Sequence, residues 1–180
     1  DSFSDGGKFN TKKRGVNHAI NLMNFGADLI DVGGESTRPG SKAIRESLEW
    51  NRVNKIIKLL IKKKIPLSLD TRKSNIMEKG IKQGVQMIND VSGLEFDINT
   101  LNILKKYKVP FVIQHTKGSP ENMQKKPNYK NVLLEIYDFF ENKLKIINRN
   151  GIKHKNIILD PGIGFGKNLK HNITLLKKIS

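Results

Sequence analysis

The sequence has 180 residues, no cysteine and a formal net charge of +16, with 33 Lys and Arg against 17 Asp and Glu. One domain fits this length, and the absence of thiols excludes a disulfide scaffold, a thiolate metal site and a cysteine nucleophile. No apolar run approaches the roughly 20 residues that span a bilayer, and no signal-peptide core opens the chain, so we expect a cytoplasmic protein without a membrane partner.

Short apolar runs rich in β-branched residues alternate with amphipathic stretches, which is typical of strands followed by helices. In chain order the spacing predicts helix 11–25, strand Leu29–Val32, helix 43–64, strand Pro66–Leu69, helix 73–83, strand Gln86–Asn89, helix 98–107, strand Pro110–Ile113, helix 130–150, strand Asn156–Leu159 and helix 168–179. Glycine follows three of these helices, at Gly26, Gly84 and Gly151, where a C-terminal cap is expected.

This alternation predicts an α/β fold, with a parallel sheet covered by helices. A doubly wound sheet and a (β/α)8 TIM barrel both fit it. Every predicted strand ends in polar residues, whereas a doubly wound sheet gathers its ligand groups at one switch point, so we favour the barrel. Five strands and six helices fall short of a closed barrel, which takes roughly 250 residues. We therefore expect a single domain over 1–180 that is a partial barrel, incomplete at both ends.

The positive charge is spread over nearly every predicted helix, as in the run Lys62-Lys63-Lys64. Arginine is scarce, and aromatic residues do not alternate with the basic ones as a single-strand stacking platform requires. We interpret this charge as solvated surface and expect no nucleic-acid partner.

Three polar side chains stand at the ends of predicted strands: Asp70, Asn89 and Asp160. The C-terminal ends of parallel strands share one edge of a sheet, so these groups would converge. Two carboxylates and an amide suit a flat heterocycle, because a carboxylate accepts two parallel N–H bonds and an amide both donates and accepts. Each could instead cap a helix or brace a loop, but the grouping favours a ligand.

Two glycine-rich loops suit anions. Thr37 and Arg38 lie among glycines, and arginine binds phosphate oxygens with a fork of donors, although Arg38 could instead bridge to a loop carboxylate. The segment Asp160-Pro-Gly-Ile-Gly-Phe-Gly-Lys167 places three alternating glycines before a lysine. Those glycines either form an anion cradle or only make tight turns.

The remaining candidates carry weaker signals. Asp1-Ser-Phe-Ser-Asp-Gly-Gly7 indicates a loop whose useful groups are Phe3 and Asp5. His115 follows a predicted strand without a visible partner, so we interpret it as a hydrogen-bonded structural histidine. No local spacing of His, Asp and Glu indicates a metal cluster, although a hard cation such as Mg²⁺ could be held mainly by phosphate oxygens.

Taken together, six segments resemble the dihydropteroate synthase family in order and spacing. They are Asp1 to Gly7, Asp31-Val-Gly-Gly-Glu-Ser-Thr-Arg-Pro-Gly40, Asp70-Thr71, Ile88-Asn89-Asp90, Met123-Gln124 with Pro127 and Tyr129, and Asp160 to Lys167 followed by His171-Asn172. The resemblance implies a (β/α)8 barrel that joins 4-aminobenzoate to 6-hydroxymethyl-7,8-dihydropterin diphosphate with Mg²⁺ present. It also implies a homodimeric full-length protein.

Carried over residue by residue, the resemblance implies three subsites. Asp70, Asn89 and Asp160 are similar to the residues that bind the pterin edge. The diphosphate-binding set would be Thr37, Arg38 and Asp5, and the residues enclosing the aminobenzoate ring would be Phe3, Pro39 and Phe165. Lys167 belongs to the last motif, and we expect less of a direct ligand contact from it.

The chain also departs from the family pattern. Gln114 and Thr116 stand where the family usually has methionine. The family's first strand, with an Asn that binds Mg²⁺, would precede Asp1, so the five strands would be the second to sixth and no metal ligand would lie within the chain. The isolated fragment is therefore expected to be inactive. Two alternatives stay open: a pterin-binding methyltransferase domain and a non-catalytic remnant of the synthase.

Overall fold

A computed structural model describes residues 12–38, 40–118, 122–124 and 127–178. Within these residues the chain forms five strands and six α-helices. The strands are β1 (Ile30–Gly33), β2 (Leu67–Asp70), β3 (Met87–Asp90), β4 (Phe111–Gln114) and β5 (Ile157–Asp160). The helices are α1 (Lys12–Asn24), α2 (Glu46–Lys62), α3 (Ser74–Gln83), α4 (Thr100–Tyr107), α5 (Val132–Arg149) and α6 (Leu169–Leu176), with a short 3₁₀-helix η1 at His154–Asn156.

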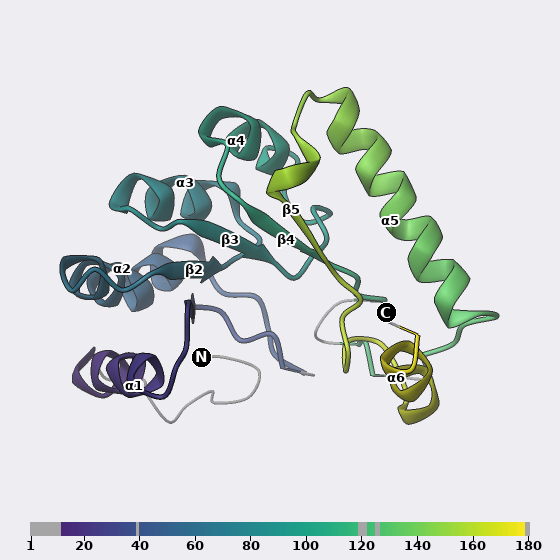
Figure 1. The fold of residues 1–180 in the computed structure, drawn as a ribbon, viewed down its shortest axis with the longest axis horizontal. Coiled ribbons are helices and arrows are strands. Elements are labelled where there is room, and N and C mark those ends of the chain that lie inside the picture. The colour runs from purple at the N-terminus through teal and green to yellow at the C-terminus, as the bar shows by residue number, and fades with distance from the viewer. Residues whose placement is uncertain (1–11, 39, 119–121, 125–126, 179–180) are drawn as a thin grey trace.

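The sheet is parallel throughout, and its strands follow the order β1-β2-β3-β4-β5. A doubly wound sheet reverses its strand order at a switch point, so the sequential order excludes that alternative. Helices α1 to α5 lie around the outside of the curved sheet (Figure 1), as they do in a (β/α)8 barrel. β1 and β5 are the two edges of the described sheet, which is therefore an open part of a barrel.

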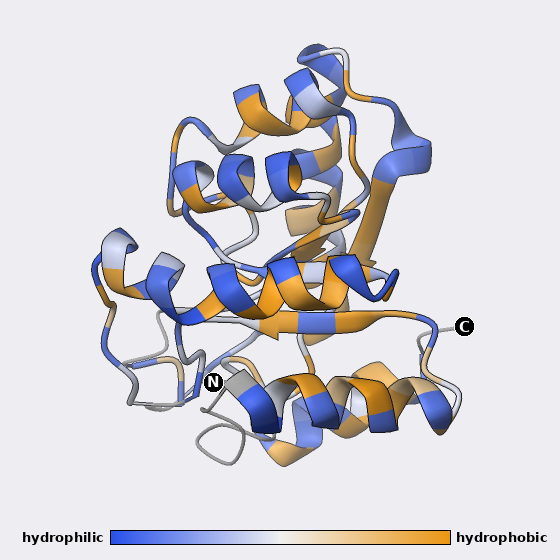
Figure 2. Cartoon of the chain, turned by 90° about the vertical axis from the view of Figure 1, so that its left-hand side faces the viewer, coloured by the Kyte–Doolittle hydropathy of each residue, from blue (hydrophilic) through white to orange (hydrophobic). Residues whose placement is uncertain are grey.

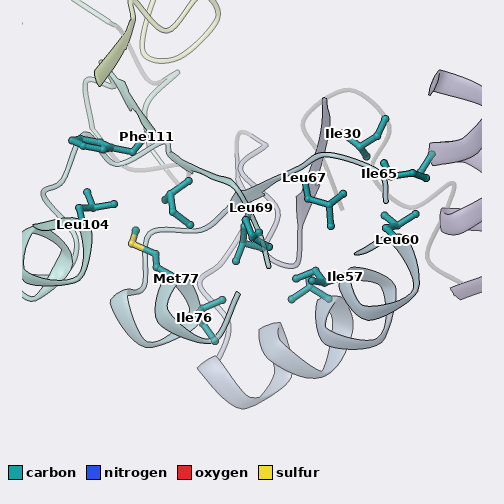
Figure 3. Close-up of a cluster of buried hydrophobic side chains, with 14 of the residues drawn as sticks. Ile30, Ile57, Leu60, Ile65, Leu67, Leu69, Ile76, Met77, Leu104 and Phe111 are labelled. Carbon is teal, nitrogen blue, oxygen red and sulfur yellow. The ribbon is translucent and has the colours of Figure 1, made fainter. Parts of the chain in front are cut away.

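The core lies between the sheet and the helices that cover it (Figure 3). Side chains without solvent exposure come from both layers: Ile57, Leu60, Leu67, Leu69, Ile76, Met77, Ile88, Leu104, Phe111 and Ile113. Figure 2 shows hydrophilic and hydrophobic residues alternating along the helices, as burial of one face requires. Trp50 of α2 packs half-buried at the margin of this core, with the Lys79 Nζ 5.8 Å from its ring centroid.

All five predicted strands are confirmed, but each begins and ends one residue later than its apolar run predicts. The sheet hydrogen bonds join backbone groups and do not depend on the polarity of the side chains, so the pairing continues one residue past each predicted end. Asp70, for example, is the last residue of β2 and pairs in register with Gly33 of β1 and Asn89 of β3. The polar side chains thus stand on strand ends, which are more rigid than loops.

Helix α2 begins three residues after its predicted start, at Glu46. The preceding residues are held in an extended conformation by the loop after β1. The Ile44 backbone N–H donates to the Glu35 carboxylate at 2.9 Å, and Arg45 has a ψ of 146°. A side chain far back in the sequence therefore competes with the helix for these residues.

Helix α5 has one buried apolar stripe, as the amphipathic pattern of the sequence predicts for its helices. Val132, Ile136 and Ile147 are buried, while Leu134 and Tyr137 on other faces are exposed. Its first turn is capped by Asn131, whose side chain accepts from two backbone N–H groups. In the part of the chain that the structure describes, no helix combines the length and apolar character needed to cross a membrane.

Candidate functional site

The polar strand ends form the floor of the candidate site. Asp70 and Asn89 are register partners on β2 and β3, and Gln114 and Asp160 are register partners on β4 and β5. Register partners project from the same face of a sheet. The sheet thus brings the three predicted heterocycle ligands to one edge, with Asp70 and Asn89 side by side.

Asp31 is part of this floor, and the sequence reasoning did not assign it a role. Its carboxylate accepts from the Asn89 Nδ2 at 3.2 Å, which orients the amide. Burial raises the pKa of Asp70 well above its usual range, with the charges of Asp31, Asp90 and Glu49 adding to the effect. The ionised form of a carboxyl with a raised pKa is stabilised by a ligand that supplies N–H donors or positive charge. Such a ligand therefore suits Asp70.

Asp90 follows Asn89 directly but points to the opposite face of the sheet. Its side chain is fully buried, and one oxygen accepts from the backbone N–H and the hydroxyl of Ser92 at 2.8 and 2.6 Å. Burial raises the pKa of Asp90 to about 6, although the Ser92 hydrogen bonds lower it. Asp90 therefore braces the turn after β3.

The glycine loop after β5 is fixed by contacts within the protein. One Asp160 oxygen accepts from the Gly162 N–H at 2.7 Å. This carboxylate therefore braces its loop, which was the alternative to ligand binding that the sequence left open. Gly162 has a φ of 68°, and a side chain there would overlap the carbonyl oxygen of His115. The tight-turn interpretation of this glycine is supported.

Lys167 faces inward at the end of this loop and is only 3% exposed. Its Nζ donates to the carbonyl oxygens of Phe165 and His115 at 2.9 and 3.2 Å, and lies 2.9 Å from the His115 Nδ1. Burial lowers the pKa of Lys167 to about 8. Burial, followed by the Lys167 charge, lowers the pKa of His115 to about 4. His115 is thus a hydrogen-bonded histidine within the fold, as predicted, and Lys167 is its partner.

The loop after β1 carries Thr37 and Arg38 and is closed by short-range bonds. The Ser41 hydroxyl donates to the Ser36 carbonyl at 2.7 Å, and the Ser41 N–H donates to the Arg38 carbonyl at 3.0 Å. Thr37 is buried and Arg38 half-buried. The loop is therefore a compact turn at the same edge as the strand ends.

An ion-pair cluster of Glu35, Glu49, Arg72 and Lys73 connects this loop to α2 and to the residues after β2. The sequence did not predict this cluster. The four residues come from the β1–α2 loop, helix α2 and the β2–α3 connection, so no local spacing reveals them. One signal was present: Glu49 stands four residues before Val53 and eight before Ile57, on the apolar stripe of α2. A carboxylate on such a stripe requires a buried partner.

A cavity of about 290 Å³ opens between the two loops. Thr37 lies on one wall and Phe165 on another, so the structure brings together one residue from each predicted loop. The Arg72 guanidinium stacks over the Phe96 ring, 4.1 Å from its centroid, and both side chains line the cavity. An aromatic wall with cationic and hydroxyl groups can accommodate an aryl group next to an anion.

Gln114 and Thr116 compensate each other. The buried Gln114 donates through its Nε2 to the Thr116 Oγ1 at 3.3 Å, and that hydroxyl donates to the Val91 carbonyl at 2.9 Å. The two departures from the methionine pattern thus form one hydrogen-bonded unit, which satisfies the buried amide.

Three of the predicted site residues, Phe3, Asp5 and Pro39, lie outside the residues that the structure describes. Among the described residues, no three His, Cys, Asp or Glu side chains are grouped as metal ligands.

Comparison with known proteins matches residues 1–180 to a family model described as pterin binding enzyme. The chain is 41% identical to a dihydropteroate synthase of Clostridium beijerinckii over 99% of its own length and 64% of the relative. The Yersinia pestis dihydropteroate synthase, solved with a sulfonamide drug complex, is similar with a TM-score of 0.93 and 38% identity, over 99% of this chain and 65% of that chain.

A Xanthomonas albilineans dihydropteroate synthase with 4-aminobenzoic acid gives a TM-score of 0.87 at 36% identity, over 98% of this chain and 63% of that chain. The predicted partial barrel is confirmed by these structural matches. The chain spans less than two thirds of the length of each of these three proteins.

Proposed function

The chain belongs to the pterin-binding enzyme family, and from this membership we propose that the protein containing it is a dihydropteroate synthase of folate biosynthesis. It would join 4-aminobenzoate to 6-hydroxymethyl-7,8-dihydropterin diphosphate, giving 7,8-dihydropteroate and diphosphate. The observation that carries the proposal is the shared strand edge of Asp70, Asn89 and Asp160. A cavity lined by Thr37 and Phe165, from the loops that follow β1 and β5, supports it.

The pterin would lie on the floor of the site. Asp70 and Asp160 present carboxylates to the N–H groups of its amino-imine edge, and Asn89 matches a neighbouring donor and acceptor. The Asn89 Nδ2 donates to the Asp31 carboxylate. This bond fixes the orientation of the amide, with one N–H directed away from the ligand. The diphosphate would reach the Thr37–Arg38 loop, with Asp5 joining it on the family pattern, and the aryl ring would lie against Phe165 with Phe3 and Pro39.

The reaction then proceeds by separation and recombination of charge. The bond between the pterin methylene carbon and the diphosphate oxygen breaks, and its electron pair leaves with diphosphate. The cationic character that remains on the pterin is stabilised by the Asp70 and Asp160 carboxylates, while Arg38 stabilises the leaving group. The amine nitrogen of 4-aminobenzoate forms the new C–N bond and loses its proton to solvent. No protein nucleophile takes part.

Mg²⁺ belongs to this proposal as an ion carried mainly by the diphosphate oxygens, where it would neutralise charge on the leaving group. The described residues fit no separate protein cage for it. The full-length protein is proposed to be a homodimer, and the isolated 180 residues are proposed to be inactive.

The test separates the two tasks of Asp160. Asp160→Asn keeps an oxygen that accepts from the Gly162 N–H but removes the charge that stabilises the pterin cation. In the full-length protein we expect kcat/KM for dihydropteroate formation to fall by roughly 100-fold or more, with an unchanged thermal midpoint. Asp160→Ala loses both tasks, so its activity and stability should both fall. The proposal would be contradicted by wild-type steady-state kinetics in Asp160→Asn, or by a wild-type protein that forms no dihydropteroate.

A further inference from the structure

The ion-pair cluster is balanced in charge and mostly buried, and Glu35 and Arg72 also line the cavity between the two loops. Lys73 is 5% exposed, and its Nζ lies 2.6 Å from a Glu35 oxygen and 2.5 Å from a Glu49 oxygen. The other Glu35 oxygen accepts from the Arg72 Nε at 2.7 Å, and the other Glu49 oxygen accepts from the Thr71 hydroxyl at 2.5 Å. Two carboxylates thus face two cations, and all four carboxylate oxygens have a donor.

The cluster joins three parts of the fold. Glu35 belongs to the loop after β1, Glu49 to the first turn of α2, and Lys73 to the start of α3, three residues after Asp70. Glu35 stands two residues before Thr37, and its carboxylate also accepts from the Ile44 N–H beyond the loop. The Glu35 side chain therefore links the residues before and after the Thr37–Arg38 loop to the residues that follow β2.

Stability alone does not account for this arrangement. A buried ion pair pays a large desolvation cost, and apolar residues of similar volume often stabilise a fold at least as well. An ion pair does differ from an apolar contact in direction, because its oxygens and donors must meet at fixed distances and angles. The cluster therefore sets the position of the loop more sharply than apolar packing would.

We propose that Lys73 and Glu35 are positioning residues, which hold the Thr37–Arg38 loop at a fixed distance from Asp70. This rests on the proposed function, in which the loop binds diphosphate and Asp70 binds the pterin ring. The cluster couples the two subsites. It therefore raises the affinity for a substrate that carries both a pterin ring and a diphosphate, and leaves the affinity for a pterin without diphosphate unchanged.

The discriminating variant is Glu35→Gln in the full-length protein. The Glu35 carboxylate serves three donors, from Arg72, Lys73 and Ile44, and a glutamine amide offers one oxygen, so at least one donor loses its acceptor. We expect KM for the pterin diphosphate to rise at least tenfold, while the Kd for 6-hydroxymethylpterin, which lacks the diphosphate, changes less than twofold. A structural defect alone would weaken both.

Glu78→Gln is the matched control. Glu78 on α3 also serves three donors, from Lys82, Lys106 and the Tyr107 hydroxyl, but it lies away from the loop. The KM of the Glu78→Gln variant for the pterin diphosphate should stay within twofold of the wild-type value. An equal rise of KM in both variants, or an unchanged KM in Glu35→Gln, overturns the inference.

Hydrogen exchange gives a second readout that does not depend on turnover. Lys73→Met should speed amide exchange in residues 34–44, and Lys73→Arg, which keeps the charge, should restore protection. If Lys73→Met does not fold, Glu35→Gln is measured by the same method. Unchanged exchange in 34–44 contradicts the inference, whereas a wild type without turnover but with these exchange effects contradicts only the proposed function.

Discussion

Asn89 and Asp90 are adjacent in the chain but have opposite environments. Asn89 lies half-buried on the floor of the site, bonded to Asp31, while Asp90 is fully buried on the helix-covered face. The period of a strand is two residues, so neighbours point to opposite faces. The same motif therefore supplies one side chain to the site and one to the fold.

Asp90 gives the stability of the protein a pH dependence. Burial raises its pKa to about 6 from 3.8, so the folded state holds a proton that the unfolded chain releases. This contribution to stability is complete below pH 3.8 and is lost as the pH rises through about 6. Asn mimics the neutral carboxyl, so Asp90→Asn should gain roughly 3 kcal/mol relative to the wild type between pH 4 and pH 7.

Urea unfolding of both chains at pH 4, 5.5 and 7 measures this difference. Asp97 provides a control of opposite sign: burial raises its pKa, but hydrogen bonds from Ser74 and Asn99 outweigh this and lower it overall. Asp97→Asn should therefore lose stability relative to the wild type toward pH 7. A stability difference for Asp90→Asn that does not change with pH would count against the buried, raised-pKa assignment.

At the scale of an element, the glycine loop after β5 depends on space as well as on backbone conformation. Gly162 and Gly151 both have left-handed φ values, 68° and 76°. A Cβ at Gly162 would lie 2.0 Å from the His115 oxygen, whereas one at Gly151 meets nothing within 4 Å. We expect Gly151→Ala to cost about 1 kcal/mol for conformation alone, and Gly162→Ala to cost clearly more because the loop must move.

Chemical denaturation of the two variants checks this comparison. Equal losses at Gly162 and Gly151 would show that the loop is not packed against His115. A larger loss at Gly162, accompanied by an altered His115 ring signal in the NMR spectrum, is the expected outcome.

Most of the elements could be predicted from the sequence because their signals are local. Apolar runs gave the five strands, spacing gave the six helices, and Gly26, Gly84 and Gly151 marked helix ends with positive φ. The strand ends were each misplaced by one residue, because backbone pairing does not depend on whether a side chain is apolar.

The convergence of Asp70, Asn89 and Asp160 at one sheet edge was predictable, because each follows an apolar run; their roles in ligand binding stay predictions. The sequence reasoning missed Asp31 and the Glu35–Lys73–Glu49 contacts, because their partners are 24 to 58 residues apart in the chain. Only the fold brings such groups together. The inward direction of Lys167 likewise depends on His115, 52 residues earlier.

At the scale of the whole molecule, β5 is an apolar edge of the open sheet that the described residues form. Ile158 and Leu159 are 47% and 41% exposed on its two faces. An exposed apolar edge strand offers unpaired backbone groups to another chain. We expect the 180-residue chain to self-associate, and Ile158→Lys to reduce this, as measured by sedimentation velocity over a concentration series.

Leu48→Lys is the matched control for that experiment. Leu48 is 45% exposed on α2, so the substitution adds the same charge at a similar exposure away from the β5 edge. If the two variants reduce association equally, net charge and not the edge is responsible.

The half-buried Trp50 gives the molecule an optical property of its own. It is the sole tryptophan of the 180 residues, and it follows Glu49 of the buried ion-pair cluster directly on α2. Its fluorescence therefore originates from a single known place, at the margin of the core and beside the groups that fasten the Thr37–Arg38 loop. Any rearrangement of α2 when a ligand binds can be followed by the emission of the unlabelled protein.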